Sequence, residues 1–205
     1  MFYKFDNIQN PKVDWQFIYK KEFNDEFCDL LLNSCEDDKW VAARVGGDPG
    51  KPGGMLDTEI RSVSHQSSKM GEYKGMQSFP YHHIADKIMR ANSEIWRLDL
   101  TGFNMETDQP NILRYRAKEA GHYNWHLDIG AEFSNRKLTC IIQLSDPKDY
   151  DGCDVEILGA PTGEKKLKER GTVIMFPSYV QHRVTKITRG TRYCWVGWVH
   201  GPHFR

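Results

Sequence analysis

The sequence lacks an excess of charge of either sign, because 28 Lys and Arg residues balance 28 Asp and Glu residues over 205 positions. Non-specific binding of nucleic acid relies on clustered positive charge. The composition therefore gives no support to a nucleic-acid partner. A chain of this length is long enough for one well-buried domain and too short for two comfortable ones, so we predict a single domain over residues 1–205.

The sequence also lacks long hydrophobic runs and paired cysteines. No apolar stretch approaches the roughly 18 residues that a membrane helix needs, and the start, "MFYKFDNIQNPK", has no secretory-signal pattern. We therefore predict a cytoplasmic protein with no membrane contact. The cysteines are odd in number and form no C-x-x-C pair, which argues against a disulfide framework and a zinc ribbon. We expect reduced, mostly buried thiols at Cys28, Cys35, Cys140, Cys153 and Cys194.

The first hundred residues show helical periodicity at two places. Asn24 is a plausible N-cap for the first helix. The apolar positions at helical spacing are Phe27, Cys28, Leu31 and Cys35, and then Ile84, Ile88, Ala91 and Ile95. Between them, "VGGDPGKPGGMLD" contains too many glycines and prolines for a regular element. We interpret its segment 46–54 either as a surface connector or as a lid.

From Leu98 onward the pattern changes to short β segments separated by turn signals. Strands at this spacing favour a barrel or jelly roll over alternating βαβ units. We predict a mainly β fold of the α+β class, with helical N-terminal support over about 1–100 and a jelly-roll core over about 101–205. The segments are "NILRY", "NWHLD", "KLTCIIQL", "DVEIL", "GTVIMF", "HRVTKI" and "RYCWVGWV".

One β segment carries a pair of side chains that suits a metal. In "NWHLDIG", His126 and Asp128 are two positions apart, so on a strand they project toward the same face. The best third ligand is His182, from a distant strand that a sheet fold can bring opposite. Two histidines and one carboxylate on one side of a metal leave other positions open, as in non-heme Fe(II) oxygenases. A structural histidine beside a turn aspartate remains the alternative.

An arginine follows the distal histidine at a suggestive offset. Arg192 lies ten positions after His182, inside the otherwise apolar and aromatic segment "RYCWVGW". A guanidinium held on a strand can bind a carboxylate through two parallel hydrogen bonds. The sequence therefore predicts an anionic ligand beside the metal.

These motifs carry a family resemblance. The runs "YRAKEAGHYNWHLD", "RKLTCIIQLSDPKDYDGCDVEI" and "GTVIMFPSYVQHRVTKITRGTRYCWVGW" resemble Fe(II)/2-oxoglutarate dioxygenases of the prolyl 4-hydroxylase type, especially the small PKHD-type hydroxylases of bacteria and phages. The resemblance covers about Asn111 to Trp198. It implies a double-stranded β-helix (jelly roll, cupin-like) core, with the N-terminal helices packed on one sheet.

The resemblance also implies roles for particular residues. His126, Asp128 and His182 correspond to the catalytic iron ligands, and Arg192 to the basic residue that holds the remote carboxylate of 2-oxoglutarate. Tyr115 resembles the tyrosine that lines the cosubstrate pocket. Thr139 and Tyr123 occupy positions that can line the same pocket, although each is equally well explained by strand packing.

The implied reaction hydroxylates a substrate C–H bond and converts 2-oxoglutarate to succinate and carbon dioxide, using Fe(II) and O₂, with ascorbate in a supporting role. Two departures from the family pattern stand near the site: Cys153 replaces the second glycine of the usual Gly-Gly, and Lys186 replaces a proline. Neither removes a ligand, but a side chain at Cys153 alters a place where glycine lets backbone pass closely.

Peptidyl or free proline is the leading substrate by resemblance, but no feature outside the cosubstrate site is specific for proline. Trp125, Trp195 and Trp198 are candidates for an apolar substrate face, with core packing expected for at least two of them. Arg61 is a further candidate for substrate contact. Three alternatives remain: a nucleic-acid-repair dioxygenase, a non-catalytic cupin-like binding protein, and a zinc hydrolase, which the absence of H-E-x-x-H disfavours. The oligomeric state is not readable from the sequence.

Overall fold

The computed structural model describes residues 14–46, 54–68, 79–130, 133–160 and 165–203, and it is mainly β, as predicted. Within these ranges, two α-helices accompany two antiparallel sheets. No described helix is long and apolar enough to span a membrane. The helical elements are α1 (Asp25–Leu32), α2 (Phe79–Glu94) and the 3₁₀ turns η1 (Asp37–Lys39), η2 (Ala117–Glu119) and η3 (Lys165–Lys168).

The larger sheet follows the order β1-β11-β8-β13-β6-β4-β2, and β5 and β9 also pair with β13. The smaller sheet has the order β10-β12-β7-β3. The strands of the larger sheet are β1 (Phe17–Tyr19), β2 (Val41–Ala42), β4 (Ser64–Ser67), β5 (Gly102–Phe103), β6 (Asn111–Arg116), β8 (Arg136–Gln143), β9 (Tyr150–Gly152), β11 (Val173–Pro177) and β13 (Ile187–His200). Those of the smaller sheet are β3 (Arg61–Ser62), β7 (His122–His126), β10 (Val155–Ile157) and β12 (His182–Val184).

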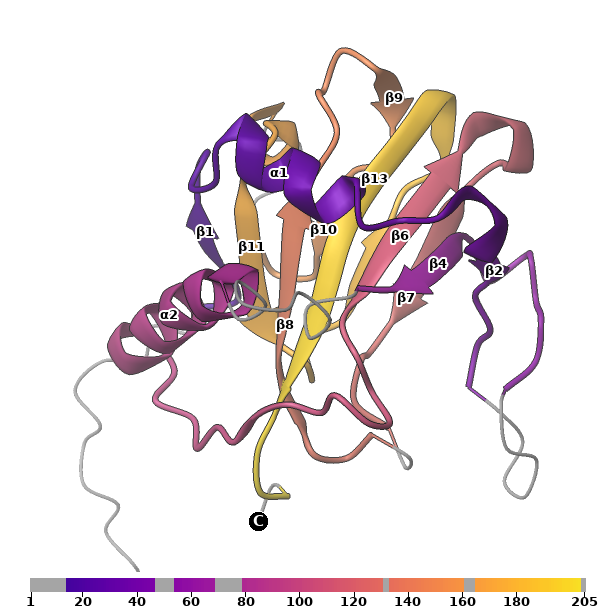
Figure 1. Cartoon of the computed structure of the whole chain (residues 1–205). Coiled ribbons are helices and arrows are strands. Elements are labelled where there is room, and N and C mark those ends of the chain that lie inside the picture. The colour runs from indigo at the N-terminus through magenta and orange to yellow at the C-terminus, as the bar shows by residue number, and fades with distance from the viewer. Residues whose placement is uncertain (1–13, 47–53, 69–78, 131–132, 161–164, 204–205) are drawn as a thin grey trace, which may run out of the picture.

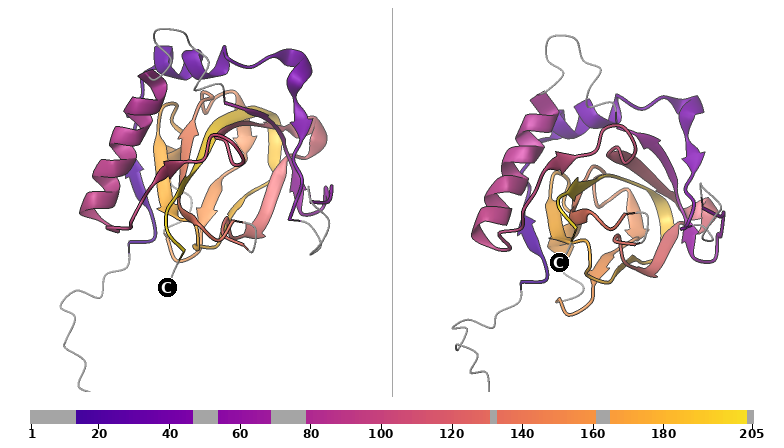
Figure 2. Two further views of the ribbon diagram at one scale, coloured as in Figure 1. Left: turned by 60° about the horizontal axis from the view of Figure 1, so that its bottom comes forward. Right: turned by 90° about the horizontal axis from the view of Figure 1, so that it is seen from below.

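The strands of the two sheets curve around an interior, and the helices lie outside it (Figure 2). Strand β8 shows how side-chain alternation separates these two sides. Leu138, Cys140 and Ile142 belong to the core beneath the helices, whereas Ile141 belongs to the core between the sheets. The predicted jelly-roll architecture is confirmed. In β8 this alternation directs every second residue toward the interior between the sheets.

Both helices cover one face of the larger sheet (Figure 1). The side chain of Asn24 accepts a hydrogen bond from the backbone N–H of Phe27, which confirms Asn24 as the N-cap of α1. Burial of Leu31 and Ile88 against the sheet then stabilises the arrangement. The predicted packing of N-terminal helices on one sheet is therefore confirmed.

The N-terminal region contains more β structure than the sequence predicts. Strands β1 to β4 precede α2 and extend both sheets. Each has between two and four residues, which is too short to establish a two-residue period in the sequence. The glycine-rich segment considered as a lid falls largely in 47–53, outside the described residues.

All five cysteines are free thiols, as predicted. Four are buried and Cys35 is half-buried. No disulfide therefore joins the described residues.

Candidate metal and cosubstrate site

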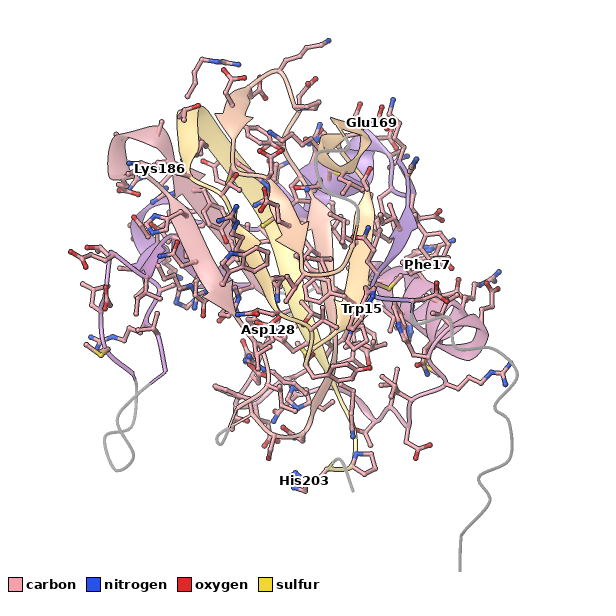
Figure 3. The ribbon with its side chains drawn as sticks, turned by 180° about the vertical axis from the view of Figure 1, so that it is seen from behind. Trp15, Phe17, Asp128, Glu169, Lys186 and His203 are labelled. Carbon is pink, nitrogen blue, oxygen red and sulfur yellow. The ribbon has the colours of Figure 1, made fainter. Side chains whose placement is uncertain are left out.

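Three of the predicted site residues meet where the smaller sheet ends. His126 is the last residue of β7 and His182 the first of β12, and the two are direct partners in the strand register. Asp128 follows β7 by two positions, and its backbone N–H donates to the carbonyl of Ser178. Seen from the side opposite to that of Figure 1, Asp128 lies near the lower end of the strands (Figure 3).

The ligand atoms of these three side chains converge. One nitrogen of each histidine and one oxygen of Asp128 all lie within 4.8 Å of one another. Nε2 of His126 is 3.6 Å from Oδ1 of Asp128, and Nε2 of His182 is 3.4 Å from Oδ2. This is the only such group of three among the residues that the structure describes.

Backbone carbonyls orient both imidazoles. Nδ1 of His126 is 2.7 Å from the carbonyl oxygen of Asn124, and Nδ1 of His182 is 3.0 Å from that of Val180. A carbonyl oxygen accepts but does not donate, so we assign the proton of each neutral ring to Nδ1. In this tautomer each Nε2, the nitrogen nearer to Asp128, has a free lone pair. A histidine that binds a metal through Nε2 needs this tautomer.

The protonation states also suit metal binding. Burial lowers the pKa of His182 to about 4, although Asp128 opposes this shift, so the ring is neutral at physiological pH. Burial of the Asp128 carboxyl favours its neutral form, but the neighbouring His182 and His126 hold its pKa well below the usual range. Thr139 contributes too, since its hydroxyl donates to Oδ2 of Asp128 at 2.6 Å. The pocket thus offers a neutral imidazole at His182 beside the carboxylate of Asp128.

Arg192 lies deeper in the same pocket and is fully buried on β13. Its Nε and Nη2 donate to Oε1 of Gln143 at 3.0 and 2.8 Å, and its Nη1 is 3.8 Å from Sγ of Cys153. Burial raises the pKa of Cys153 to about 11 and that of Tyr150 to about 12, so neither provides a negative charge at physiological pH. No acidic side chain of the described residues forms an ion pair with Arg192. A buried cation without a counter-ion calls for an anionic ligand.

The remaining sequence candidates differ in their placement. Tyr115 is buried in the pocket, with the Arg192 guanidinium 5.4 Å from its ring centroid. Tyr123 also lines the pocket and stacks on His126 with ring centroids 3.4 Å apart. Trp198 lines the pocket as well, whereas Trp195 packs beneath the helices. Trp125 is 39% exposed and lies under the guanidinium of Arg183, away from the pocket.

A buried ionic cluster beside the site was not predicted. Arg136 donates through Nε and Nη2 to the carboxylate of Asp108, and through Nη1 to the backbone carbonyl of Asp128 at 3.1 Å. Nε2 of His200 lies 2.9 Å from the same Asp108 carboxylate. The Arg136 guanidinium packs on the ring of Trp198. The cluster therefore fixes the turn that carries Asp128, through residues far apart in the sequence.

The residues present fit a ferrous ion and a dicarboxylate. Two imidazole nitrogens and one carboxylate on one side of a cavity are the donor set of the non-heme Fe(II) oxygenases. The same cavity holds Arg192, whose charge no described acid balances. The His126, Asp128 and His182 group would hold the metal, and Arg192 the anion.

Comparison with known proteins agrees with this geometry. Residues 110–200 match the model of the 2OG-Fe(II) oxygenase superfamily, where 2OG denotes 2-oxoglutarate. A PKHD-type hydroxylase of Gloeothece citriformis is 35% identical over 92 residues, which are 43% of this chain and 42% of that protein. The matched segments thus span less than half the length of the first curated relatives. The resemblance to oxygenases of the PKHD type is confirmed.

Solved structures share the fold at low sequence identity. A Pseudomonas putida prolyl-4-hydroxylase superposes with a TM-score of 0.67 at 18% identity, covering 92% of this chain and 93% of that one. A prolyl hydroxylase of Trichoplax adhaerens, in complex with a peptide fragment of the hypoxia inducible factor oxygen degradation domain, superposes with a TM-score of 0.70 at 14% identity. It covers 91% of this chain and 84% of that one. At such identities the likeness establishes the fold alone.

Proposed function

We propose that this chain, whose residues 110–200 carry the 2OG-Fe(II) oxygenase fold and sequence pattern, is a 2-oxoglutarate-dependent hydroxylase that acts on the prolyl ring of a peptide or of free proline. We take residues 1–205 as a single dioxygenase domain, with helical support over about 1–100 and the catalytic core over about 101–205. Succinate and carbon dioxide are the expected co-products. Ascorbate is expected to support turnover.

One observation carries the proposal: a convergent His126, Asp128 and His182 group shares its cavity with the uncompensated charge of Arg192. A non-catalytic binding protein of this fold would have no need of both features. A hydrolytic zinc site would have no need of a buried arginine beyond the metal. A cosubstrate that carries two carboxylates, one toward the metal and one toward the arginine, makes use of both.

Each side chain then has a task. Bound iron supplies the reactivity with oxygen that couples decarboxylation of the cosubstrate to hydroxylation. Arg192 neutralises the remote carboxylate and fixes the direction in which the cosubstrate enters. Thr139 and the backbone carbonyls of Asn124 and Val180 hold the ligands in their binding orientations. The enclosed interior excludes water around these groups.

The prolyl substrate is supported by similarity and by pocket chemistry. Two of the solved structures that share the fold are a prolyl-4-hydroxylase and a prolyl hydroxylase bound to a peptide fragment. In this chain, Tyr123 and Trp198 provide aromatic surfaces at the metal end of the cavity. Aromatic side chains bury a large apolar area and can therefore pack against the ring of a prolyl residue.

A mass-resolved turnover assay tests the proposal. The purified protein with Fe(II), 2-oxoglutarate, ascorbate and air is incubated with free L-proline and with proline-containing peptides. We expect the gain of one oxygen atom in a substrate and an equal yield of succinate, both lost in Asp128→Ala. Hydroxylation that persists in Asp128→Ala, or exclusive turnover of substrates without proline, would contradict it.

A further inference from the structure

We propose that Arg44 and Arg61 form an anion-binding subsite at the mouth of the cavity, which recognises a carboxylate of the substrate close to the carbon that is hydroxylated. The inference deepens the proposed function, on which it rests, by naming a chemical feature of the substrate. The cosubstrate does not use this subsite, because its carboxylates are assigned to the metal and to Arg192.

The subsite lies in a second hollow, of about 400 Å³, which adjoins the metal end of the first pocket. Arg61, Tyr123, Asp128 and Trp198 line both spaces, so a ligand in the hollow reaches the metal ligands directly. The hollow also has an apolar side, formed by Leu113, Leu127, Ile129 and Phe133. It therefore suits a ligand that is partly apolar and carries a small charged group.

Arg61 is held in place by three contacts. It stands on β3 opposite Tyr123 of β7, and its guanidinium carbon is 4.5 Å from the centroid of the Tyr123 ring. Since that ring stacks on His126, one aromatic ring separates the guanidinium from a metal ligand. Nη1 donates to the backbone carbonyl of Arg44 at 3.0 Å. Nε is buried and has no hydrogen-bond partner among the residues that the structure describes, although it is a strong donor.

Arg44 brings a second positive charge to the same hollow. Its side chain is exposed, and Nη1 donates to the carbonyl of Gly54 at 3.2 Å. Both contacts of this pair, from Arg61 to Arg44 and from Arg44 to Gly54, are made to neutral carbonyl oxygens. Both guanidiniums therefore line one hollow, and no acidic side chain of the described residues pairs with either of them.

The acids of the hollow are already committed. The Asp108 carboxylate binds Arg136 and lies beside His200. Asp128 belongs to the metal group. Among the described residues, neither Arg44 nor Arg61 forms an ion pair, so two positive charges remain at the mouth. Two guanidiniums on one side of a cavity match a carboxylate through charge and hydrogen-bond geometry.

The carboxylate can come from two sources with the same chemistry. One is the α-carboxylate of free proline or of a C-terminal residue, and the other is an acidic side chain next to a prolyl residue within a peptide. A phosphate group could also bind to two positively charged guanidiniums. The apolar lining of the hollow and the zero net charge of the chain favour a small carboxylate ligand over a polyanion.

Equilibrium binding to the metal-free protein tests the subsite without turnover. The probes are L-proline and L-prolinamide, and capped tripeptides in which proline is flanked by aspartate, asparagine or lysine, titrated by ligand-observed NMR. A single-stranded oligonucleotide serves as the phosphate probe. We expect one carboxylate probe to bind on the order of tenfold more tightly than its counterpart without the carboxylate. The pair of probes that shows this preference identifies the source of the carboxylate, either the α-carboxylate or an acidic side chain.

Matched variants attribute the preference to the two arginines. Arg61→Gln and Arg44→Gln are expected to reduce the carboxylate preference to about twofold or less, and added salt to weaken it. Arg90→Gln is the control, because Arg90 is an exposed arginine on α2 that pairs with Asp86. Arg44 is exposed, so Arg44→Gln tests the subsite even where Arg61→Gln disturbs folding.

Equal affinity for the probes with and without a carboxylate overturns the inference. A preference for the carboxylate that both variants retain does so as well. If the oligonucleotide binds most tightly of all the probes, the subsite recognises phosphate and not carboxylate, and the inference is again overturned. Carboxylate-selective binding without any hydroxylation refutes the proposed function while it leaves the subsite intact. Hydroxylation of proline peptides irrespective of their charge supports the proposed function and refutes the subsite.

Discussion

Single side chains set the geometry of the proposed metal site, and Thr139 does so through its hydroxyl. Thr139 Oγ1 donates to Oδ2 of Asp128 and lies 3.1 Å from Oγ of Ser178. The sequence placed Thr139 among the residues that line the cosubstrate pocket. The structure adds a contact with the metal group, so its expected effect is on the orientation of the carboxylate.

Thr139→Val removes this hydrogen bond with almost no change in shape. We expect the affinity for Fe(II) to fall by about tenfold, because groups that orient a metal ligand typically contribute this much. Anaerobic titration of the metal-free protein with Fe(II) measures the effect. Thr139→Ser keeps the hydroxyl and should bind as the unmodified chain does; identical affinity in the Val variant would remove Thr139 from the account.

Gln143 is the hydrogen-bond partner that leaves the positive charge of Arg192 unbalanced within the pocket. Its Oε1 accepts both hydrogen bonds from the guanidinium, and its Nε2 donates to the carbonyl of Leu167. Because this partner is neutral, the charge of Arg192 remains available for a ligand.

Gln143→Glu gives Arg192 a carboxylate of its own and should therefore compete with the cosubstrate. We expect the affinity for 2-oxoglutarate to fall by at least about tenfold while Fe(II) binding is unchanged. Calorimetric titration with each ligand in turn separates the two effects. Gln143→Leu is the uncharged counterpart: it should lower stability by about 1–3 kcal/mol through lost hydrogen bonds, and retain more cosubstrate affinity than the Glu variant. The reverse order would contradict this role for Arg192.

At the level of elements, strand pairing explains part of what the sequence could predict about the site, although Asp128 lies two positions beyond the end of β7 and not on the strand itself. His126 and Asp128 are two positions apart, and the structure brings both toward one side, with His182 on the neighbouring strand β12. The contacts of Gln143 and the Asp108 and Arg136 pair escaped prediction. They join residues many positions apart, and such contacts depend on strand order and register, which composition and periodicity do not specify. The strands β2 and β3 could not be predicted either, because two residues are too few to show the alternation of a strand.

The helices act as support for the sheet, with no direct part in the chemistry. Ile88 of α2 is 2% exposed in the core against the larger sheet, whereas the adjacent Met89 is 54% exposed. Ile88→Ala should lower the free energy of unfolding by about 2–4 kcal/mol. Met89→Ala should change it by no more than about 0.5 kcal/mol. Urea denaturation measures both, and equal effects of the two substitutions would contradict the packing of α2 on the sheet.

For the whole molecule, the balance of 28 basic and 28 acidic residues predicts weak interaction with polyanions. We expect no retention of single-stranded DNA in a filter-binding experiment at low salt. Tight binding that weakens steeply as salt increases would instead favour the nucleic-acid-repair alternative. The identity of the substrate belongs to this scale as well, because it depends on the surface around the cavity mouth and not on the metal ligands.

The central claim is that His126, Asp128, His182 and Arg192 make one site for iron and 2-oxoglutarate. Anaerobic addition of Fe(II) and then 2-oxoglutarate to the metal-free protein tests it directly, through the visible charge-transfer band of the chelated keto acid. We expect a band when both are present, lost in Asp128→Ala and weakened in Arg192→Ala. A folded protein that shows no band, or a band unaffected by both substitutions, would contradict the account.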